Sequence, residues 1–204
     1  MSNYRLISNK RKHEVVAREL KEKYGNNRII LYEKQIWNLF KKIYYQNIRH
    51  DILEYKTFCI PWICGACKLA MHITTIKYNL RSNIKITYDG SNKESAPVFP
   101  AQSIGYIEVI KKLYESYGMI YENPVYNIEG TDDKTEEFGL KTGKGTKKEH
   151  VFFSTQHSCF TGILLHLHSR LYYRLTKRGN IIREFSPEVL KRKIEELKQL
   201  LPKN

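Results

Sequence analysis

The sequence predicts an α+β protein whose N-terminal half is mainly helical. Apolar residues recur at helical spacing in several stretches, and short alternating runs bounded by glycine, asparagine or aspartate read as strands. The chain has 204 residues, of which 41% are hydrophobic, and this is enough to enclose a buried core. We find no internal repeat and no clear linker, so the simplest prediction is a single domain over residues 1–204.

Three helical patterns precede the middle of the chain. Residues 10–24 form a charged, basic helix that Gly25 ends, and residues 30–48 form a more strongly amphipathic one. Pro61 fits the start of a third helix, and residues 62–80 could form one buried helix, although residues 72–78 could equally be the end of a helix followed by a strand.

The middle of the chain alternates strand and helix signals. Residues 84–88 alternate and stop at Asp-Gly, which is typical of a short strand and turn. After a loop, residues 102–117 form an amphipathic helix with Ser103 as N-cap and Gly118 as C-cap. Its apolar face consists of Tyr106, Ile107, Ile110, Leu113, Tyr114 and Tyr117.

The predicted helix 102–117 is followed at once by a strand pattern. Residues 119–128 and 149–156 read as two strands of a β-hairpin, and the polar run 130–148 forms its flexible tip. A C-terminal helix over residues 187–201 begins with a Ser-Pro pair, a frequent helix start.

Positive charge is concentrated toward the two ends of the chain. The formal net charge is +14. Residues 1–50 carry 12 lysines and arginines against 4 acidic residues, and residues 151–204 carry 10 against 4. Such a charge favours a polyanionic partner, because each neutralised phosphate releases counterions.

A helix that ends at a glycine before a hairpin resembles the recognition helix and wing of a winged helix-turn-helix. Residues 170–187 (Arg-Leu-Tyr-Tyr-Arg-Leu-Thr-Lys-Arg-Gly-Asn-Ile-Ile-Arg-Glu-Phe-Ser-Pro) add a strand, a charged turn and a second strand before the last helix. Over about half its length the chain thus resembles winged-helix replication initiator proteins of plasmids and phages. The resemblance implies a cytoplasmic, non-enzymatic protein that binds specific sequences of double-stranded DNA, in replication initiation or its control on a mobile element.

The resemblance also implies which residues contact DNA. The leading end of the helix 102–117 would enter the major groove, where Gln102, Ser103 and Tyr106 would meet base edges. Cations farther along this helix, in the hairpin tip and near the N-terminus would meet phosphates. These are Lys111, Lys112, Lys141, Lys144, Lys147, Lys148, Arg11, Lys12 and Arg18.

The cysteines offer a weak candidate for a metal site. Cys59, Cys64, Cys67 and His72 have spacings that could supply four zinc ligands. Their surroundings are apolar, however, as expected of a buried helix, and core packing is the simpler interpretation. We find no Walker loop and no dinucleotide-binding fingerprint, so the sequence predicts neither a metal nor another cofactor.

Two other functions remain open. The basic ends and the 15 tyrosines would also suit an RNA-binding protein, or a structural protein of a ribosome or virion. A metal-dependent enzyme would use the cysteines or the pair His166 and His168. The apolar stripe of the C-terminal helix could support a homodimer, and no stretch is apolar enough for a membrane span.

Overall fold

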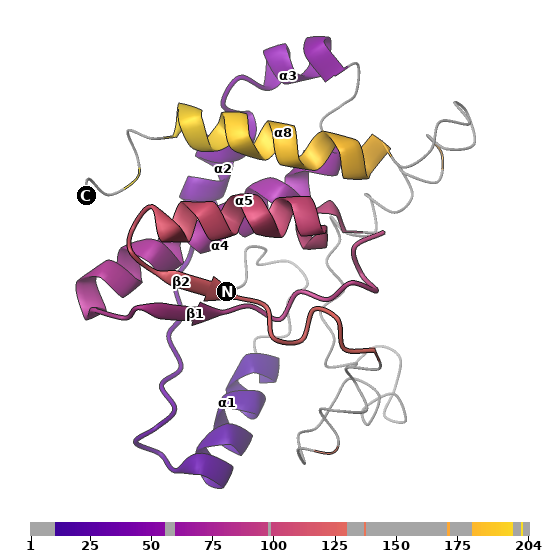
Figure 1. Ribbon diagram of the computed structural model, residues 1–204. Coiled ribbons are helices and arrows are strands. Elements are labelled where there is room, and N and C mark those ends of the chain that lie inside the picture. The colour runs from indigo at the N-terminus through magenta and orange to yellow at the C-terminus, as the bar shows by residue number, and fades with distance from the viewer. Residues whose placement is uncertain are drawn as a thin grey trace. The chain divides into compact units, whose positions relative to one another are not determined.

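Figure 1 shows the computed structural model of the chain. The chain divides into two compact units, residues 1–35 with 128–160 and residues 36–127 with 161–204. A single domain over residues 1–204 therefore stays a prediction. The structure describes residues 11–55, 60–97, 99–129, 137, 171, 181–197 and 201.

The first unit contains helix α1, Arg11–Tyr24. Gly25 ends it with a φ of +96°, a backbone conformation that glycine adopts without strain. The Gly25 amide donates to the Lys21 carbonyl at 2.9 Å, which satisfies one of the terminal acceptors. The predicted N-terminal helix is thus confirmed.

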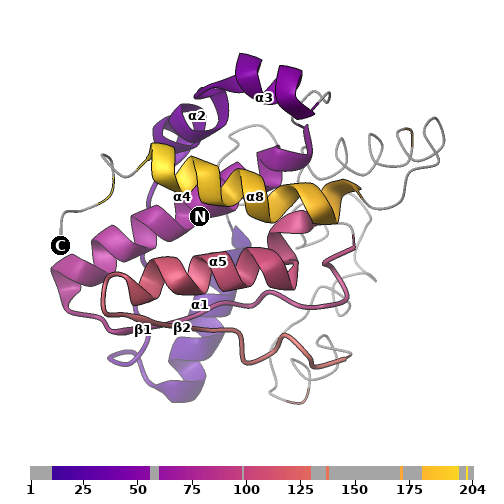
Figure 2. The ribbon, with the colours of Figure 1, turned by 45° about the horizontal axis from the view of Figure 1, so that its top comes forward.

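Most of the described residues of the second unit are helical. Its longest helix is α4, Ile60–Ser82, against which α2, Trp37–Tyr45, and α8, Ile181–Glu196, are packed. Helix α5, Ile104–Glu115, lies alongside α8, as Figures 1 and 2 show from two directions. The described part of the unit also contains α3, Ile48–Tyr55, and the short 3-10 turn η1, Pro100–Gln102.

A two-stranded sheet completes this unit. Strand β1, Ile86–Tyr88, pairs in parallel with β2, Ile120–Glu122, so that Ile86 lies opposite Ile120. Helix α5 is the connection between the two strands. The α+β class is therefore confirmed, with a parallel pair in place of the expected first hairpin strand. The predicted partner strand, residues 149–156, and the hairpin tip 130–148 lie outside the described residues except for position 137.

The core of the second unit joins α2, α4, α5 and α8. Ile43, Leu69, Ile110 and Leu190, one from each of these helices, are fully buried. Helix α5 approaches α8 closely at Gly105, where an added Cβ would lie 2.9 Å from a ring carbon of Pro187. Glycine at this position is what allows the two helices to pack so tightly.

Two helix boundaries differ from the prediction. The expected helix 30–48 is observed as the shorter α2, since residues 29–36 are not helical. Asn47, with a φ of +58°, separates α2 from α3. The C-terminal helix starts at Ile181 rather than 187, with Pro187 inside it. The second strand predicted in the 170–187 block is therefore wrong, because residues 181–185 belong to α8, and the helix continues through the Ser-Pro pair. Among the described residues, none of the helices combines the length and apolar content that a membrane crossing requires.

Candidate nucleic-acid interface

The leading end of α5 is enclosed by intramolecular contacts. Ser103 is 8% exposed and caps the helix, since its Oγ accepts from the Tyr106 amide at 3.3 Å. Tyr106 is 0% exposed, and its hydroxyl donates to the Gly65 carbonyl on α4 at 2.9 Å. The Gln102 side-chain oxygen accepts from the Asn92 amide at 3.0 Å.

Ser103 and Tyr106 are thus buried, whereas Ile104 between them is 55% exposed, and base contacts by this end of the helix stay a prediction. The caps predicted at Ser103 and Gly118 are present, and Gly118 has a φ of +65°. However, Ser103 and Tyr106 could reach a DNA groove only by leaving the partners that hold α5 on the core. Their positions therefore indicate a structural role.

The exposed face of α5 carries balanced charge. Lys111 and Lys112 are exposed, as the prediction requires, but Glu108 and Glu115 share the same exposed face. The two acids cancel the two bases, so this face provides little net attraction for a phosphate backbone.

The other predicted cations are described only in part. Arg18 is exposed on α1. Arg11 and Lys12 lie in the first turn of that helix, and the structure describes their backbone but not their side chains. Lys141, Lys144, Lys147 and Lys148 lie outside the described residues.

The outer face of α2 carries cations that the sequence analysis did not select. Asn38, Lys41, Lys42 and Tyr45 are all exposed and recur at i, i+3, i+4 and i+7, which places them on one face. No acidic residue occurs from position 34 to position 50. This acid-free run of lysine and tyrosine was the signal that could have identified the face.

The structure describes three of the four residues of the cysteine candidate, Cys64, Cys67 and His72. Cys64 and Cys67 are half-buried on α4, and Cys59 lies outside the described residues. Among the residues that the structure describes, no three His, Cys, Asp or Glu side chains group closely enough to hold a metal ion.

His72 is instead part of an aromatic cluster. Its Nδ1 lies 3.3 Å from the Tyr114 hydroxyl, and its ring meets those of Tyr114 and Tyr121 edge to face. Burial, reinforced by the nearby Lys68 ammonium, lowers the pKa of His72 to about 3. At neutral pH the imidazole is therefore uncharged and serves as packing.

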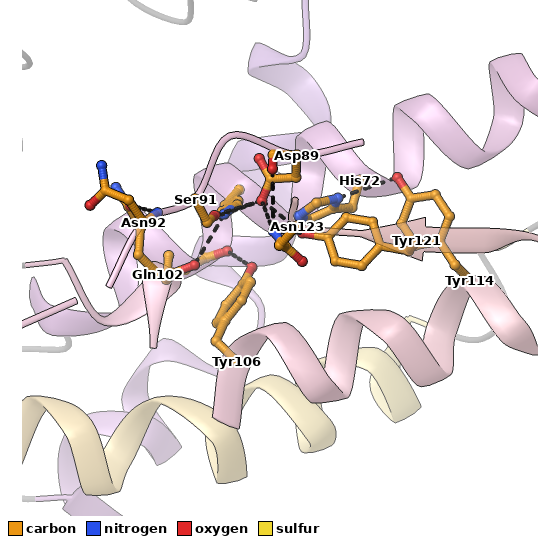
Figure 3. A network of polar contacts seen from close by, with 12 residues as sticks. His72, Asp89, Ser91, Asn92, Gln102, Tyr106, Tyr114, Tyr121 and Asn123 are labelled. Carbon is orange, nitrogen blue, oxygen red and sulfur yellow. Dashed lines mark hydrogen bonds and ion pairs between the residues drawn. The ribbon is translucent and has the colours of Figure 1, made fainter. Parts of the chain in front are cut away.

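Asp89 lies at the centre of a polar cluster at the carboxyl ends of the two strands (Figure 3). Its Oδ2 accepts from Ser91 Oγ at 2.6 Å and from the Tyr121 hydroxyl at 2.7 Å. Lys68 on α4 places its ammonium 2.8 Å from the same oxygen, and Asn123 donates to it at 3.2 Å. The cluster thus joins both strands to α4.

The protonation states in this cluster are fixed near neutral pH. Burial alone would raise the pKa of Asp89, but the Lys68 charge and the hydrogen bonds from Ser91 and Tyr121 hold it well below its usual range. Burial and the Asp89 charge raise the pKa of Tyr121, so its hydroxyl remains a donor. The arrangement is that of a clamp that positions β1 and β2 on α4.

The sequence-based analysis missed this cluster, although it carried a signal. Asp89 directly follows one predicted strand, residues 84–88, and Asn123 lies within another, residues 119–128. Only the parallel pairing of these strands brings the two residues to the same edge.

Comparisons with known proteins give no relative for this chain. No family model matches it, and neither a curated protein nor a solved structure does so.

Proposed function

We propose that this protein binds duplex DNA through contacts between its exposed cations and the phosphates, in replication initiation or its control on a mobile element. The observation that carries the proposal is the formal net charge of +14, with its excess at the two ends of the chain. A field of this sign and size concentrates polyanions at the protein surface.

The exposed position of Arg18 supports a phosphate contact, whereas Lys111 and Lys112 are offset by Glu108 and Glu115 on their own face. The burial of Ser103 and Tyr106 leaves base recognition by the leading end of α5 out of the proposal. The role in replication rests on the resemblance to winged-helix initiators alone.

The proposal is tested by fluorescence anisotropy of a labelled duplex at several salt concentrations. The logarithm of the binding constant should fall linearly with the logarithm of salt concentration, with a slope of about −0.9 for each phosphate contacted. Replacing Arg18 with Gln should reduce the magnitude of the slope by up to about 0.9 and weaken binding to all sequences alike.

The matched control lies on the exposed face of α5. The pair Glu108→Gln with Glu115→Gln should strengthen duplex binding, whereas Lys111→Gln with Lys112→Gln should weaken it. A wild-type protein with no measurable duplex affinity at low salt would contradict the proposal. Stronger binding of structured RNA than of duplex DNA in competition would favour the RNA-binding alternative instead.

A further inference from the structure

We propose that the outer face of α2, formed by Asn38, Lys41, Lys42 and Tyr45, binds single-stranded nucleic acid. In this site Lys41 and Lys42 contact the phosphates of the strand, and the ring of Tyr45 stacks on an unpaired base. This goes beyond duplex binding, because it assigns a second surface and a second class of ligand.

The helical geometry places the required groups together. Lys41 and Lys42 precede Tyr45 by four and three residues, the spacings at which side chains on a helix are neighbours. All three are exposed, and Tyr45 is 57% exposed. A groove or face that alternates cations with an aromatic ring is the common arrangement for single strands.

Contact with a buried neighbouring ring also restricts the Tyr45 side chain. Its ring meets that of the buried Tyr44 edge to face, with centroids 5.1 Å apart. Tyr44 in turn stacks on Phe40, with centroids 5.6 Å apart. The adjacent Gln46 carbonyl accepts from the fully buried Lys193 ammonium. A ring fixed in this way loses little conformational freedom when it binds a base.

Electrostatics favour an anionic ligand here more than on α5. Lys41 has its ammonium 5.5 Å from the centre of the Trp37 ring, a contact that adds no negative charge to this face. The next acidic residue along the chain, Asp51, is buried and paired with Arg192 and Lys193. The α2 face therefore keeps its positive charge, whereas the exposed charges of α5 cancel.

Single strands fit this face better than duplex. A base can stack on Tyr45 only if its flat surface is accessible, and in a duplex neighbouring base pairs cover that surface. DNA and RNA single strands share this chemistry, and the experiment distinguishes them.

The test measures anisotropy of labelled oligothymidylate and oligouridylate with the full chain. Tyr45→Ala should weaken single-strand affinity about fivefold or more, without changing the salt dependence. Tyr45→Phe should retain affinity within about twofold, because the stacking surface is kept. Lys41→Gln with Lys42→Gln should lower the magnitude of the salt slope by about 1.4, at about 0.7 per phosphate of a single strand.

Two matched variants serve as controls. Tyr88→Ala removes a tyrosine that is 63% exposed on β1, and Lys111→Gln with Lys112→Gln makes the same change of charge on α5. The inference is overturned if Tyr45→Ala weakens binding no more than Tyr88→Ala. It is also overturned if both lysine pairs lower the slope equally, or if the wild-type chain binds neither oligonucleotide.

The duplex titration judges the proposed function separately. Duplex binding that persists in Tyr45→Ala, with single-strand binding lost, supports both proposals. If the protein binds duplex and Tyr45→Ala leaves single-strand binding unchanged, only the proposed duplex-binding function is retained.

Discussion

Helices α2 and α5 belong to the same unit and show the same amphipathic pattern, yet their exposed faces differ. Helix α5 buries its leading end against α4, and its exposed charges cancel. Helix α2 buries Phe40, Ile43 and Tyr44 and leaves an acid-free face of lysine and tyrosine to solvent. The apolar spacing of a helix therefore indicates which side packs, while the charge of the opposite side indicates which helix can bind a polyanion.

The largest expected effect breaks the packing of α5. Tyr106→Ala removes a fully buried ring and its hydrogen bond to Gly65, and should lower the free energy of unfolding by about 3 to 5 kcal/mol. Urea denaturation measures this, with Tyr45→Ala on α2 as the exposed control, expected to change it by about 0.5 kcal/mol or less. If Tyr106→Ala left stability unchanged and abolished duplex binding, the leading end of α5 would be the DNA-contacting element after all.

The second largest effect on stability should come from the polar cluster around Asp89. Asp89→Asn removes the charge that pairs with Lys68, and should lower the free energy of unfolding at neutral pH by about 2 kcal/mol. The folded-state pKa of Asp89 is lowered, so its stabilisation is present above its unfolded pKa of 3.8 and is lost as pH falls through the folded value. The difference between wild type and variant should therefore shrink below about pH 4. A constant difference from neutral pH into strong acid would contradict the ion-pair account.

His72 gives a prediction for mildly acidic pH. The pKa of His72 is 6.5 in the unfolded chain and about 3 in the fold, so between these pH values the unfolded chain binds a proton that the folded one does not. The free energy of unfolding should therefore fall as the pH is lowered from 6.5 toward 3, by up to about 1.4 kcal/mol per pH unit. His72→Gln should flatten this part of the pH profile in urea titrations. An unchanged slope would mean that protonated His72 finds a place in the folded protein.

The smallest expected effect concerns the cap of α5. Ser103→Ala should lower the free energy of unfolding by about 1 kcal/mol, whereas Ser103→Asp keeps a capping oxygen and should cost less. Neither change should alter duplex affinity if the residue only caps the helix. A loss of affinity in Ser103→Asp with unchanged thermal stability would restore the predicted groove contact.

Local signals in the sequence predicted much of the fold. The helix over residues 11–24, the cap at Ser103 and the stop at Gly118 depend on interactions within a few residues, and each was predictable. The buried positions of α5 followed from their spacing. The Ser-Pro signal at 186–187 shows the limit of local reasoning, since α8 continues through it.

Long-range pairing explains what the sequence did not reveal. The strand after Gly118 was predicted, but its partner is β1, on the other side of α5 in the chain. Without that pairing, the meeting of Asp89 with Asn123 could not be foreseen. The α2 face could have been predicted from its acid-free composition, but the recognition-helix resemblance directed attention to α5.

The parallel sheet makes one part of the molecule depend on another. The Ile120 amide donates to the Lys85 carbonyl at 2.8 Å and the Asp89 amide to the Glu122 carbonyl at 2.9 Å, across a connection that contains the whole of α5. Both bonds close a loop that contains α5, so docking of that helix reduces the entropy cost of forming them. Opening of α5 should therefore expose both strands to hydrogen exchange in a single cooperative event.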